Sequence, residues 1–382
     1  MRYVNLITTR KPILPTQTYN LPDLPPRVDF ETRTIMRVLN EASRALAQFN
    51  GNSKTVPNQD ILVSTLFLQE ALASSEIENI VTTEDELFRA DLFQDNSNNP
   101  AAKEVTRYRD ALHHGYRKME DANGILSSNL LIELFQILKQ QQDGFRKTPG
   151  TVLRSQQTGE DIYVPPQESD EIIRLMNELE TFINRDDLCD LDPLIKMTII
   201  HHQFESIHPF SDGNGRIGRI LNVLYLTRTG LLNMPILYIS REITRRKSDY
   251  YRLLQAVRDE NEWEEWVVFM LHCVCMAALN AQILVNQFRI LMQNVKIRMR
   301  EQLPKIYSQD LLNNLFRHPY TRIDFVMRDL NVTRQTASRY LNLLAKEGFV
   351  TKVNNGRSNY FINDALVKLF LNVSKEEKPE NS

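Results

Sequence analysis

Apolar residues recur at spacings of three and four along most of this chain. Residues 31–48 and 58–75 show this pattern, which predicts amphipathic helices. Further helices are expected after the polar turn at 95–101 and over residues 128–141. Because such patterns continue to about Glu301, we predict a mainly α protein.

Local signals mark where several of these helices begin and end. Thr83 with Glu86 three residues on is a capping box, which indicates a helix start. Asp192 followed by Pro193 is typical of an N-cap and the first helical position. Gly230 is expected to end the helix that contains "RILNVLYLTRTG".

Two regions depart from the helical pattern. Within 151–166, apolar residues flank the turn-rich "SQQTGED", which predicts a β-hairpin. Beyond residue 303, segments 310–329 and 333–347 are expected to be short helices, and "GFVTKVNNGRSNYFIN" reads as two strands around an Asn-Asn-Gly turn. We therefore place a domain boundary near residue 303.

Composition narrows the class of protein. A chain of 382 residues is too long for one average domain, and 42% hydrophobic with 25% charged residues is ordinary for a globular protein. The net charge of -2 excludes binding of nucleic acid or anionic membrane through bulk charge. The longest apolar run, residues 266–279, is too short to span a bilayer, so no membrane is expected as a partner.

The cysteines and the N-terminus indicate the compartment. Cys189, Cys273 and Cys275 are odd in number and lack C-x-x-C spacing, which favours reduced thiols. The first 17 residues lack the apolar core and cleavage site of a signal peptide. The proline-rich first 30 residues are expected to run extended over the fold. We expect a cytoplasmic protein.

The densest concentration of chemistry is residues 208–219, "HPFSDGNGRIGR". This stretch holds three of the chain's 12 glycines, together with two arginines, a histidine and an aspartate. Gly, Asn and Asp favour turns, and a structural turn is the plain interpretation. A turn alone, however, needs neither two arginines at i and i+3 nor a histidine before it. The composition favours a site for a strongly anionic ligand.

The backbone of this stretch suits phosphate. A helix that ends near Ile207 and another that begins about Asn214 leave N–H groups pointing at the loop between them. Gly213 and Gly215 allow a ligand to approach that backbone without interference from a Cβ atom.

The side chains of the stretch suit nucleotide chemistry. Arg216 and Arg219 lie one helical turn apart, where both can reach a polyphosphate. Asp212 offers a hard oxygen ligand for Mg²⁺. His208 has an ordinary pKa suited to removing a proton near pH 7. These are the parts of transfer from a nucleoside triphosphate.

At every defined position, "HPFSDGNGRIGR" resembles the core motif of the Fic family, H-P-F-x-[D/E]-G-N-[G/K]-R-x-x-R. The flanking "HHQFESIHPF", "LLNMPILYIS" and "YYRLLQAVR" agree, and the resemblance extends over about residues 60–290. It implies a Fic-type helical core that transfers AMP from ATP, with Mg²⁺, to a Ser, Thr or Tyr hydroxyl of a target protein or of the chain itself. Pyrophosphate would leave.

The resemblance also implies a role for each motif residue. His208 would deprotonate the target hydroxyl, Asp212 would hold Mg²⁺, and Phe210 would pack inward to hold the loop. A glycine at position 215 favours AMP transfer, because relatives with lysine there resemble kinases that transfer the γ-phosphate. The residues expected to bind ATP are Gly213, Asn214, Gly215, Arg216, Ile217, Gly218 and Arg219, with Tyr251 in the adenine pocket.

The stretch "SSEIEN" matches the family's inhibitory motif, [S/T]-x-x-x-E-[G/N], through Ser74, Glu78 and Asn79. Read alone, it is an acidic helix face followed by a polar turn. The resemblance implies that Glu78 pairs with Arg219 and so occupies an arginine needed for the γ-phosphate. We therefore expect an autoinhibited enzyme, with an inhibitory helix at about 58–79 in an N-terminal region 1–125 and a catalytic core at 126–300.

In the same resemblance, the predicted hairpin is a flap that docks the target by strand addition. A surface hairpin without this role is the alternative. The residues expected to hold the target backbone are Val152, Leu153, Arg154, Ile162, Tyr163 and Val164.

Residues 305–364 resemble a winged helix-turn-helix, and 365–382 read as a tail. The module carries nine Lys and Arg against five Asp and Glu, which gives about +4. DNA binding and protein docking or dimerisation both fit such a module. The residues expected to face DNA are Arg334, Gln335, Ser338 and Arg339 on the second helix and Arg357 at the wing.

Three alternatives to AMP transfer by an autoinhibited enzyme stay open. One is a transcription regulator in which the core only senses nucleotide, although such a sensor does not need His208. Another is the reverse reaction, removal of AMP, with Glu78 positioning a water molecule. The third is a kinase. The residues do not fix an oligomeric state, and a homodimer, common in the family, is one outcome.

Overall fold

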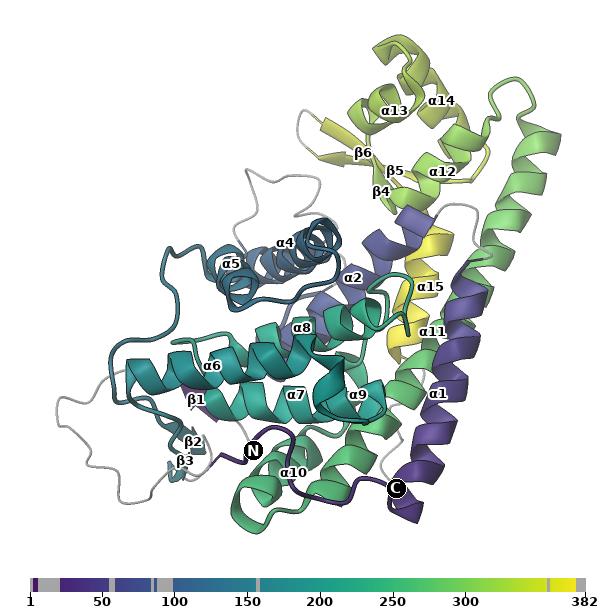
Figure 1. The fold of residues 1–382 in the computed structure, drawn as a ribbon. Helices are drawn as coiled ribbons and strands as arrows, with labels where there is room; N and C mark the ends of the chain where they lie inside the picture. The colour runs from purple at the N-terminus through teal and green to yellow at the C-terminus, as the bar shows by residue number, and fades with distance from the viewer. Residues whose placement is uncertain are drawn as a thin grey trace, which may run out of the picture. The chain divides into compact units, whose positions relative to one another are not determined.

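A computed structural model (Figure 1) describes residues 3–5, 21–54, 59–83, 86–87, 99–155, 159–355 and 358–375. The chain divides into two compact units. The first comprises residues 1–50, 66–81 and 104–279, and the second comprises 51–65, 82–103 and 280–382. This division cuts the long helix α11 (Trp263–Gln302) between Leu279 and Asn280, whereas the boundary near residue 303 stays a prediction from sequence.

The chain is mainly helical, as predicted, with two small antiparallel sheets. The helices up to the motif are α1 (Arg33–Ser53), α2 (Gln59–Ile77), α4 (Pro100–Asp121), α5 (Ser128–Lys139), α6 (Ser169–Asn184), the 3-10 turn η1 (Asp186–Leu188) and α7 (Pro193–Ile207). From the motif onward they are α8 (Asn214–Arg228), α9 (Ser240–Arg245), α10 (Lys247–Glu260), α11, α12 (Gln309–Arg317), α13 (Ile323–Leu330), α14 (Arg334–Lys346) and α15 (Asp364–Lys375).

Several of the predicted helix starts and ends are confirmed by their capping residues. The Asp192 carboxylate accepts a hydrogen bond of 2.8 Å from Leu194 N at the start of α7. Thr83 and Glu86 make the reciprocal bonds of a capping box, Glu86 N to Thr83 Oγ1 at 3.2 Å and Thr83 N to Glu86 Oε2 at 3.0 Å. Gly230, two residues past the end of α8, has φ of 76°.

Helix α7 forms the centre of the first unit. Every residue from Leu194 to Ile207 is buried, so this helix is covered on all sides. Trp266 of α11 packs on it and donates from Nε1 to Thr198 O at 3.0 Å. Because α7 leads directly into the motif and α8 directly out of it, the motif loop is fixed at both ends by core helices.

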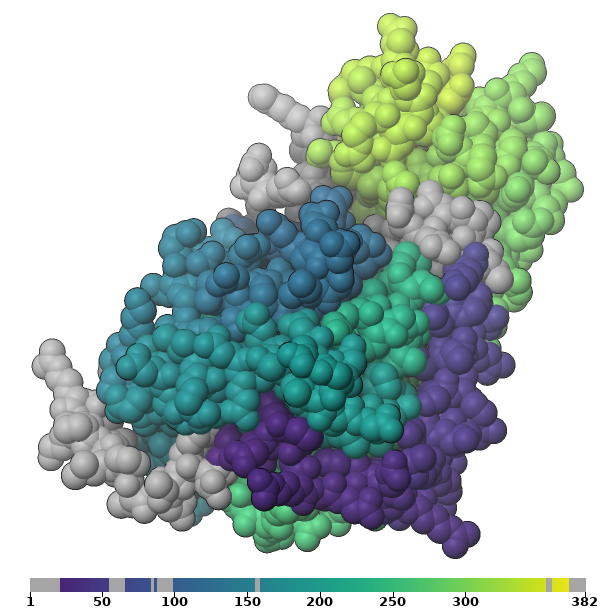
Figure 2. Space-filling view, viewed as in Figure 1, coloured from purple at the N-terminus to yellow at the C-terminus, as the bar shows by residue number. Residues whose placement is uncertain are grey.

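Residues 21–32 run without helix or strand along this unit, as predicted for the described part of the proline-rich segment. Leu24 N donates to Glu178 Oε1 of α6 at 3.3 Å, and Gln203 Nε2 of α7 donates to Pro22 O at 3.2 Å. Figure 2 shows this segment in purple on the surface beside the teal helices.

The predicted hairpin is present as strands β2 (Leu153–Ser155) and β3 (Asp161–Tyr163), paired antiparallel with a register irregularity after Leu153. A third strand, β1 (Tyr3–Asn5), pairs antiparallel with β2, with Asn5 opposite Leu153, and gives the order β1-β2-β3. The sequence did not predict β1.

The second unit contains α12, α13 and α14 with a sheet in the order β4-β6-β5. Its strands are β4 (Tyr320–Thr321), β5 (Thr351–Asn355) and β6 (Ser358–Ile362), so the two predicted strands are confirmed. The short helices predicted over 310–329 and 333–347 are present as α12, α13 and α14. Helices α12 and α13 are separate, because Pro319 lacks the N–H that a helix needs and β4 follows it.

The structure also bears on the predicted C-terminal tail and on the predicted absence of a membrane span. The tail predicted from residue 365 was wrong up to residue 375, because α15 buries Leu366 and Phe370 at helical spacing. By length and composition alone, α11 is long and apolar enough to cross a membrane, but 61% of its most apolar window is buried inside the protein. That is the pattern of a core helix.

Candidate functional site

A cavity of about 370 Å³ in the first unit gathers most of the residues predicted for catalysis, nucleotide and metal binding, and inhibition. This volume is in the range of small-molecule sites. The lining residues used below come from the motif, the inhibitory stretch, the flap and helices α4, α5, α7 and α10; they are Glu78, Asn79, Glu104, Lys139, Leu153, Glu205, His208, Asp212, Gly213, Asn214, Gly215, Arg216, Arg219, Tyr250, Tyr251, Leu254 and Arg258.

His208 is held in a left-handed backbone conformation at the end of α7, with φ of 50°. The guanidinium of Arg146 fixes this turn. Its Nε donates to His208 O at 2.8 Å, and its Nη2 donates to Ile207 O at 3.4 Å and also to Pro166 O. Burial, with Arg146 and Arg258 nearby, lowers the pKa of His208 to about 3. The imidazole is therefore neutral at neutral pH, as a proton acceptor must be.

The loop after His208 is fixed by Phe210 and Asn214. The Phe210 ring stacks on Phe135 of α5 at 4.6 Å between centroids, which confirms that it packs inward. Asn214 accepts from Phe210 N at 2.9 Å and donates to Phe210 O at 2.8 Å, so its side chain closes the loop. Gly213 has φ of 77°, which a residue with a side chain adopts only with strain.

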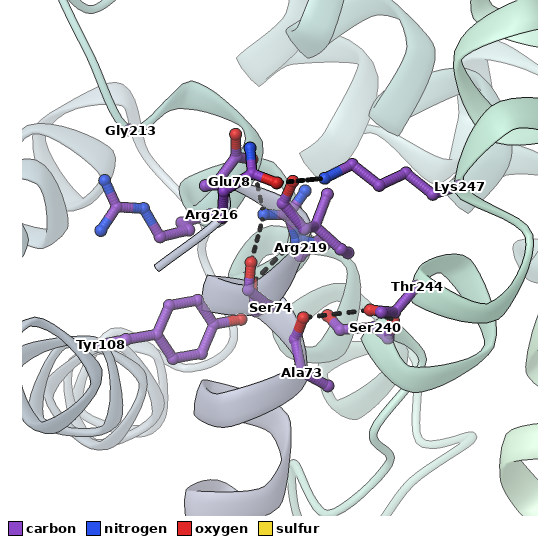
Figure 3. Close-up of polar contacts among 12 residues, drawn as sticks. Ala73, Ser74, Glu78, Tyr108, Gly213, Arg216, Arg219, Ser240, Thr244 and Lys247 are labelled. Atoms are coloured by element: carbon purple, nitrogen blue, oxygen red, sulfur yellow. Dashed lines mark hydrogen bonds and ion pairs between the residues drawn. The ribbon is translucent and has the colours of Figure 1, made fainter. Parts of the chain in front are cut away.

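Arg219 and the inhibitory stretch meet as predicted (Figure 3). Arg219 Nη2 donates to Glu78 Oε1 at 2.8 Å and to Ser74 O at 3.0 Å, and Nε donates to Ser74 Oγ at 2.8 Å. Arg219 and Ser74 are fully buried. Burial alone would lower the pKa of Arg219, but the Glu78 carboxylate together with Tyr250 and Tyr108 outweighs it, and the net shift is upward. This arginine is charged and held on three acceptors.

The end of α2 is anchored so that Glu78 reaches the site. Asn79 adopts φ of 62°, which turns the chain after the helix. Lys247 at the start of α10 donates to Ile77 O and, at 3.4 Å, to Asn79 Oδ1 (Figure 3). A cation at a helix C-terminus is electrostatically favourable. A Cβ atom on Gly215 would lie 2.4 Å from Glu78 Oε1, so the glycine leaves the space that the carboxylate fills.

The other motif arginine points away from Arg219 (Figure 3) and pairs elsewhere. Arg216 Nη1 donates to Glu104 Oε1 of α4 at 2.5 Å, and Lys139 Nζ lies 3.5 Å from the same oxygen. Lys139 Nζ also donates to Asp212 Oδ2 at 2.6 Å. Sequence reasoning missed Glu104 and Lys139, since they lie 112 and 73 residues from their motif partners.

Asp212 is suited to a metal only in part. Its Oδ1 accepts from Gly213 N at 2.6 Å, and its Oδ2 is held by Lys139. Burial alone would raise the pKa of Asp212, but Lys139, Arg216 and the Gly213 N–H together outweigh it and the net shift is downward, so the group is a carboxylate. No cluster of three or more His, Cys, Asp or Glu that could hold a metal occurs among the described residues. One carboxylate fits Mg²⁺ that is bound mainly through phosphate oxygens.

Tyr251 lines the cavity as predicted, and its ring packs edge-on against Tyr250 at 5.1 Å. Ile217 and Gly218 do not line it. Ile217 is buried and its N–H bonds to Gly213 O within the helix, and Gly218 faces α7. The predicted phosphate contacts of Ile217 and Gly218 are therefore not supported.

Glu205 is a cavity residue that sequence reasoning also missed. It is buried three residues before His208, and its Oε1 has no hydrogen-bond partner among the described residues. Burial raises its pKa to about 7. A buried acid in a cleft with a raised pKa is the usual sign of a functional site, but the carboxyl in "FES" has no local pattern that predicts burial.

The flap lies against the end of α7. Tyr163 donates from its hydroxyl to Ser206 O at 2.8 Å, and the Arg258 guanidinium lies 4.0 Å from the Tyr163 ring centroid. Leu153 is buried and lines the cavity, whereas Arg154 pairs with Asp161 across the hairpin. Val152 is buried, and Ile162 and Val164 are half-buried. The structure thus brings the hairpin to the edge of the cavity that holds His208.

The residues predicted to face DNA lie on α14 in the second unit, except Arg357, which lies outside the described residues. Arg334, Gln335 and Arg339 are exposed and Ser338 is half-buried. Arg334 Nη1 lies 3.3 Å from Asp324 Oδ1 of α13. Thr333 caps α14 as predicted, accepting from Thr336 N at 3.3 Å.

The fold and the site define a mainly helical protein in which a helix–loop–helix with a glycine-rich loop faces one cavity. The chain contains a Fic/DOC family domain. The model of that family matches residues 125–226, and the model of the Fic/DOC family N-terminal region matches 36–117. A third, the C-terminal domain of SoFic-like protein adenylyltransferases, matches 291–366.

Curated relatives share the core. The chain is 31% identical over 111 residues to protein adenylyltransferase Fic of Drosophila erecta, covering 29% of this chain and 21% of that protein. It is 27% identical over 173 residues to a probable protein adenylyltransferase of Aquifex aeolicus, covering 44% and 49%. The chain thus spans about a fifth to a half of the length of these relatives.

Solved structures show the same fold. A Fic family protein from Desulfovibrio desulfuricans superposes with a TM-score of 0.53 at 21% identity, over 87% of this chain and 96% of that one. A Fic domain containing signaling protein from Bacteroides thetaiotaomicron gives 0.52 at 19% identity, over 63% and 95%.

Proposed function

We propose that this protein is an autoinhibited adenylyltransferase that moves AMP from ATP to a hydroxyl side chain of a target protein or of the chain itself. The observation that carries the proposal is the single cavity that holds His208, the N-terminus of α8, and Arg219 bound by Glu78. The names of the relatives, protein adenylyltransferases, support the same reaction.

In the proposed reaction, the target hydroxyl oxygen bonds to the α-phosphorus as the bond from that phosphorus to the oxygen bridging to the β-phosphorus breaks. Pyrophosphate leaves with the electron pair. The hydroxyl proton passes to the His208 imidazole, which is neutral for this purpose. Gly213 and Gly215 line the cavity at the N-terminus of α8, where N–H groups favour phosphate oxygens.

Asp212 is the residue that would hold Mg²⁺, which would supply charge neutralisation between the phosphates when bound. Adenine would lie toward Tyr251 and Leu254, the aromatic and apolar part of the lining.

Autoinhibition is part of the proposal. Arg219 donates hydrogen bonds to Ser74 of α2 and to Glu78 just after it, so the guanidinium is already engaged before a γ-phosphate arrives. A nucleotide must either displace Glu78 or bind without Arg219. Removal of AMP by water held at Glu78 is less favoured, because its Oε1 is engaged by Arg219.

We further propose that the target adds as a strand to the flap, with Leu153 nearest the cavity. Because β1 already pairs with β2, a target strand would have to replace β1 at that edge.

Phosphate labelling tests the reaction. Full-length Glu78→Gly protein would be incubated with Mg²⁺ and ATP labelled at either the α- or the γ-phosphate, and label on protein counted. AMP transfer predicts label from α only. Label from the γ-phosphate only would identify a kinase. Label from neither phosphate would favour the alternative in which the core only senses nucleotide.

A second proposal concerns the second unit, whose exposed Arg334 and Arg339 on α14 favour DNA binding through a winged helix-turn-helix. Retention of the full chain on duplex DNA should fall steeply with salt and be lost in Arg334→Ala/Arg339→Ala protein. Unchanged retention would favour protein docking instead. Cytoplasmic location and a homodimer stay predictions.

A further inference from the structure

Lys139 is the feature of the cavity that the proposed reaction does not use. It is the last residue of α5, and its side chain is 20% exposed. Its Nζ lies 2.6 Å from Asp212 Oδ2, the carboxylate oxygen that would otherwise face a metal. An ammonium group therefore stands where a divalent cation would bind.

Lys139 is also part of a larger charge network. Arg216, Glu104, Lys139 and Asp212 form a chain of contacts at 2.5, 3.5 and 2.6 Å. Two cations and two carboxylates sum to zero, so this end of the cavity is electrostatically balanced without ligand. A polyphosphate adds negative charge here and a metal adds positive charge, and either one disturbs the balance.

The two cations cannot both stay on Asp212. An ammonium and a divalent ion on one oxygen repel strongly at this distance in a partly buried site. Lysine has a flexible four-carbon stem and a compact charge, so it can change partners without movement of the backbone. Asp212 and Lys139 line the same cavity as the α8 N-terminus, where the phosphates are expected.

We propose that Lys139 is a nucleotide-binding residue that neutralises Asp212 in the empty site and moves to a phosphate oxygen when Mg²⁺ and ATP bind. Glu104 keeps Lys139 and Arg216 at this end of the cavity until then. This inference rests on the proposed function only in that the cavity must bind ATP; it does not require transfer.

The test uses binding, measured on the full-length protein. Wild type, Lys139→Met and Lys139→Arg would be titrated with ATP by calorimetry in the presence of Mg²⁺, and with Mn²⁺ alone by electron paramagnetic resonance. Lys118→Met is the matched control, because Lys118 is an exposed lysine on α4 and the charge change is the same. Asp212→Asn marks the Mn²⁺ signal that belongs to the site.

Lys139→Met should bind ATP about tenfold more weakly, as expected for loss of a charge-assisted bond to phosphate. It should bind Mn²⁺ about tenfold more tightly, because the competing ammonium is gone. Lys139→Arg should stay near wild type in both titrations. Opposite changes in the two affinities separate this role from a purely structural one, which would weaken both.

Equal ATP affinity in wild type and Lys139→Met, or unchanged or weaker Mn²⁺ binding in Lys139→Met, would overturn the inference. If wild type itself bound no ATP, the proposed function would fail instead. Lys118→Met is expected to match wild type throughout.

Discussion

In the proposed function, Arg219 is the residue on which catalysis and inhibition meet. It is fully buried, and it donates to the Ser74 hydroxyl and carbonyl on α2 and to the Glu78 carboxylate just after α2. A buried guanidinium without acceptors is costly, so these contacts stabilise the arrangement that we propose to be inactive. A phosphate must bind Arg219 more strongly than Ser74 and Glu78 do in order to displace them.

Ser74→Ala tests how much the Ser74 hydroxyl contributes, beside Glu78, to keeping Arg219 in place. It removes one acceptor of a buried charged group, a change worth about 1.5–3 kcal/mol. We expect AMP incorporation above wild type and below Glu78→Gly, measured with α-labelled ATP. Ser75→Ala is the control, because Ser75 is buried but its hydroxyl has no partner among the described residues. Equal activities of the two serine variants would remove Ser74 from the inhibitory contact.

The inhibitory and motif residues were predictable because each set lies in one short stretch with recognisable spacing. Lys139, Glu104, Glu205 and Arg146 were not predictable. They reach the site from other helices or loops, and locally each looks ordinary. Lys139 at a helix end, for instance, reads as a cation that complements the helix dipole.

At the scale of elements, one side chain ties the flap to the catalytic turn. Arg146 donates to carbonyl oxygens of Ile207 and His208 at the end of α7 and to Pro166 just after β3. Buried carbonyl groups at a helix end need such donors. The position of His208 thus depends on a residue that precedes the flap.

Arg146→Met is expected to leave these carbonyls without a charged donor and to destabilise the protein by about 2–5 kcal/mol. In a Glu78→Gly background, Arg146→Met should lower AMP incorporation at least tenfold, and Arg146→Lys should recover part of it. Urea unfolding and labelled-ATP incorporation measure the two effects. A Met variant as active as its parent would show that His208 is positioned without Arg146.

The element boundaries also show where sequence patterns fall short. Caps such as Asp192 and Thr83 depend on neighbours in sequence, and they were predicted correctly. Strand β1 depends on pairing with β2, about 150 residues away, so three residues in a proline-rich segment could not reveal it. The division of α12 from α13 follows from Pro319 alone, since proline lacks the N–H that a helix needs.

At the scale of the whole molecule, two buried acids make stability depend on pH. Burial raises the pKa of Glu205 and of Glu70 to about 7, from an ordinary value of 4.5. In the folded protein these groups keep their protons up to about pH 7, whereas in the unfolded chain they lose them near pH 4.5. Their contribution is therefore complete below pH 4.5 and lost as pH rises through 7.

Glu205→Gln should remove one such dependence. From pH 5 to pH 8, the free energy of unfolding of wild type should fall relative to Glu205→Gln by about 3 kcal/mol. Urea unfolding at both pH values measures the difference, with Glu260→Gln, an exposed position on α10, as control. A difference between wild type and Glu205→Gln that is the same at both pH values would contradict the raised pKa.

We propose that Glu78 restrains an AMP transferase whose base is His208. This is tested by incorporation of α-labelled ATP into protein, compared in wild type, Glu78→Gly and Glu78→Gly/His208→Ala. We expect at least tenfold more label in Glu78→Gly than in wild type, and label at background in the double variant. Equal label in wild type and Glu78→Gly, or label that survives His208→Ala, would contradict it.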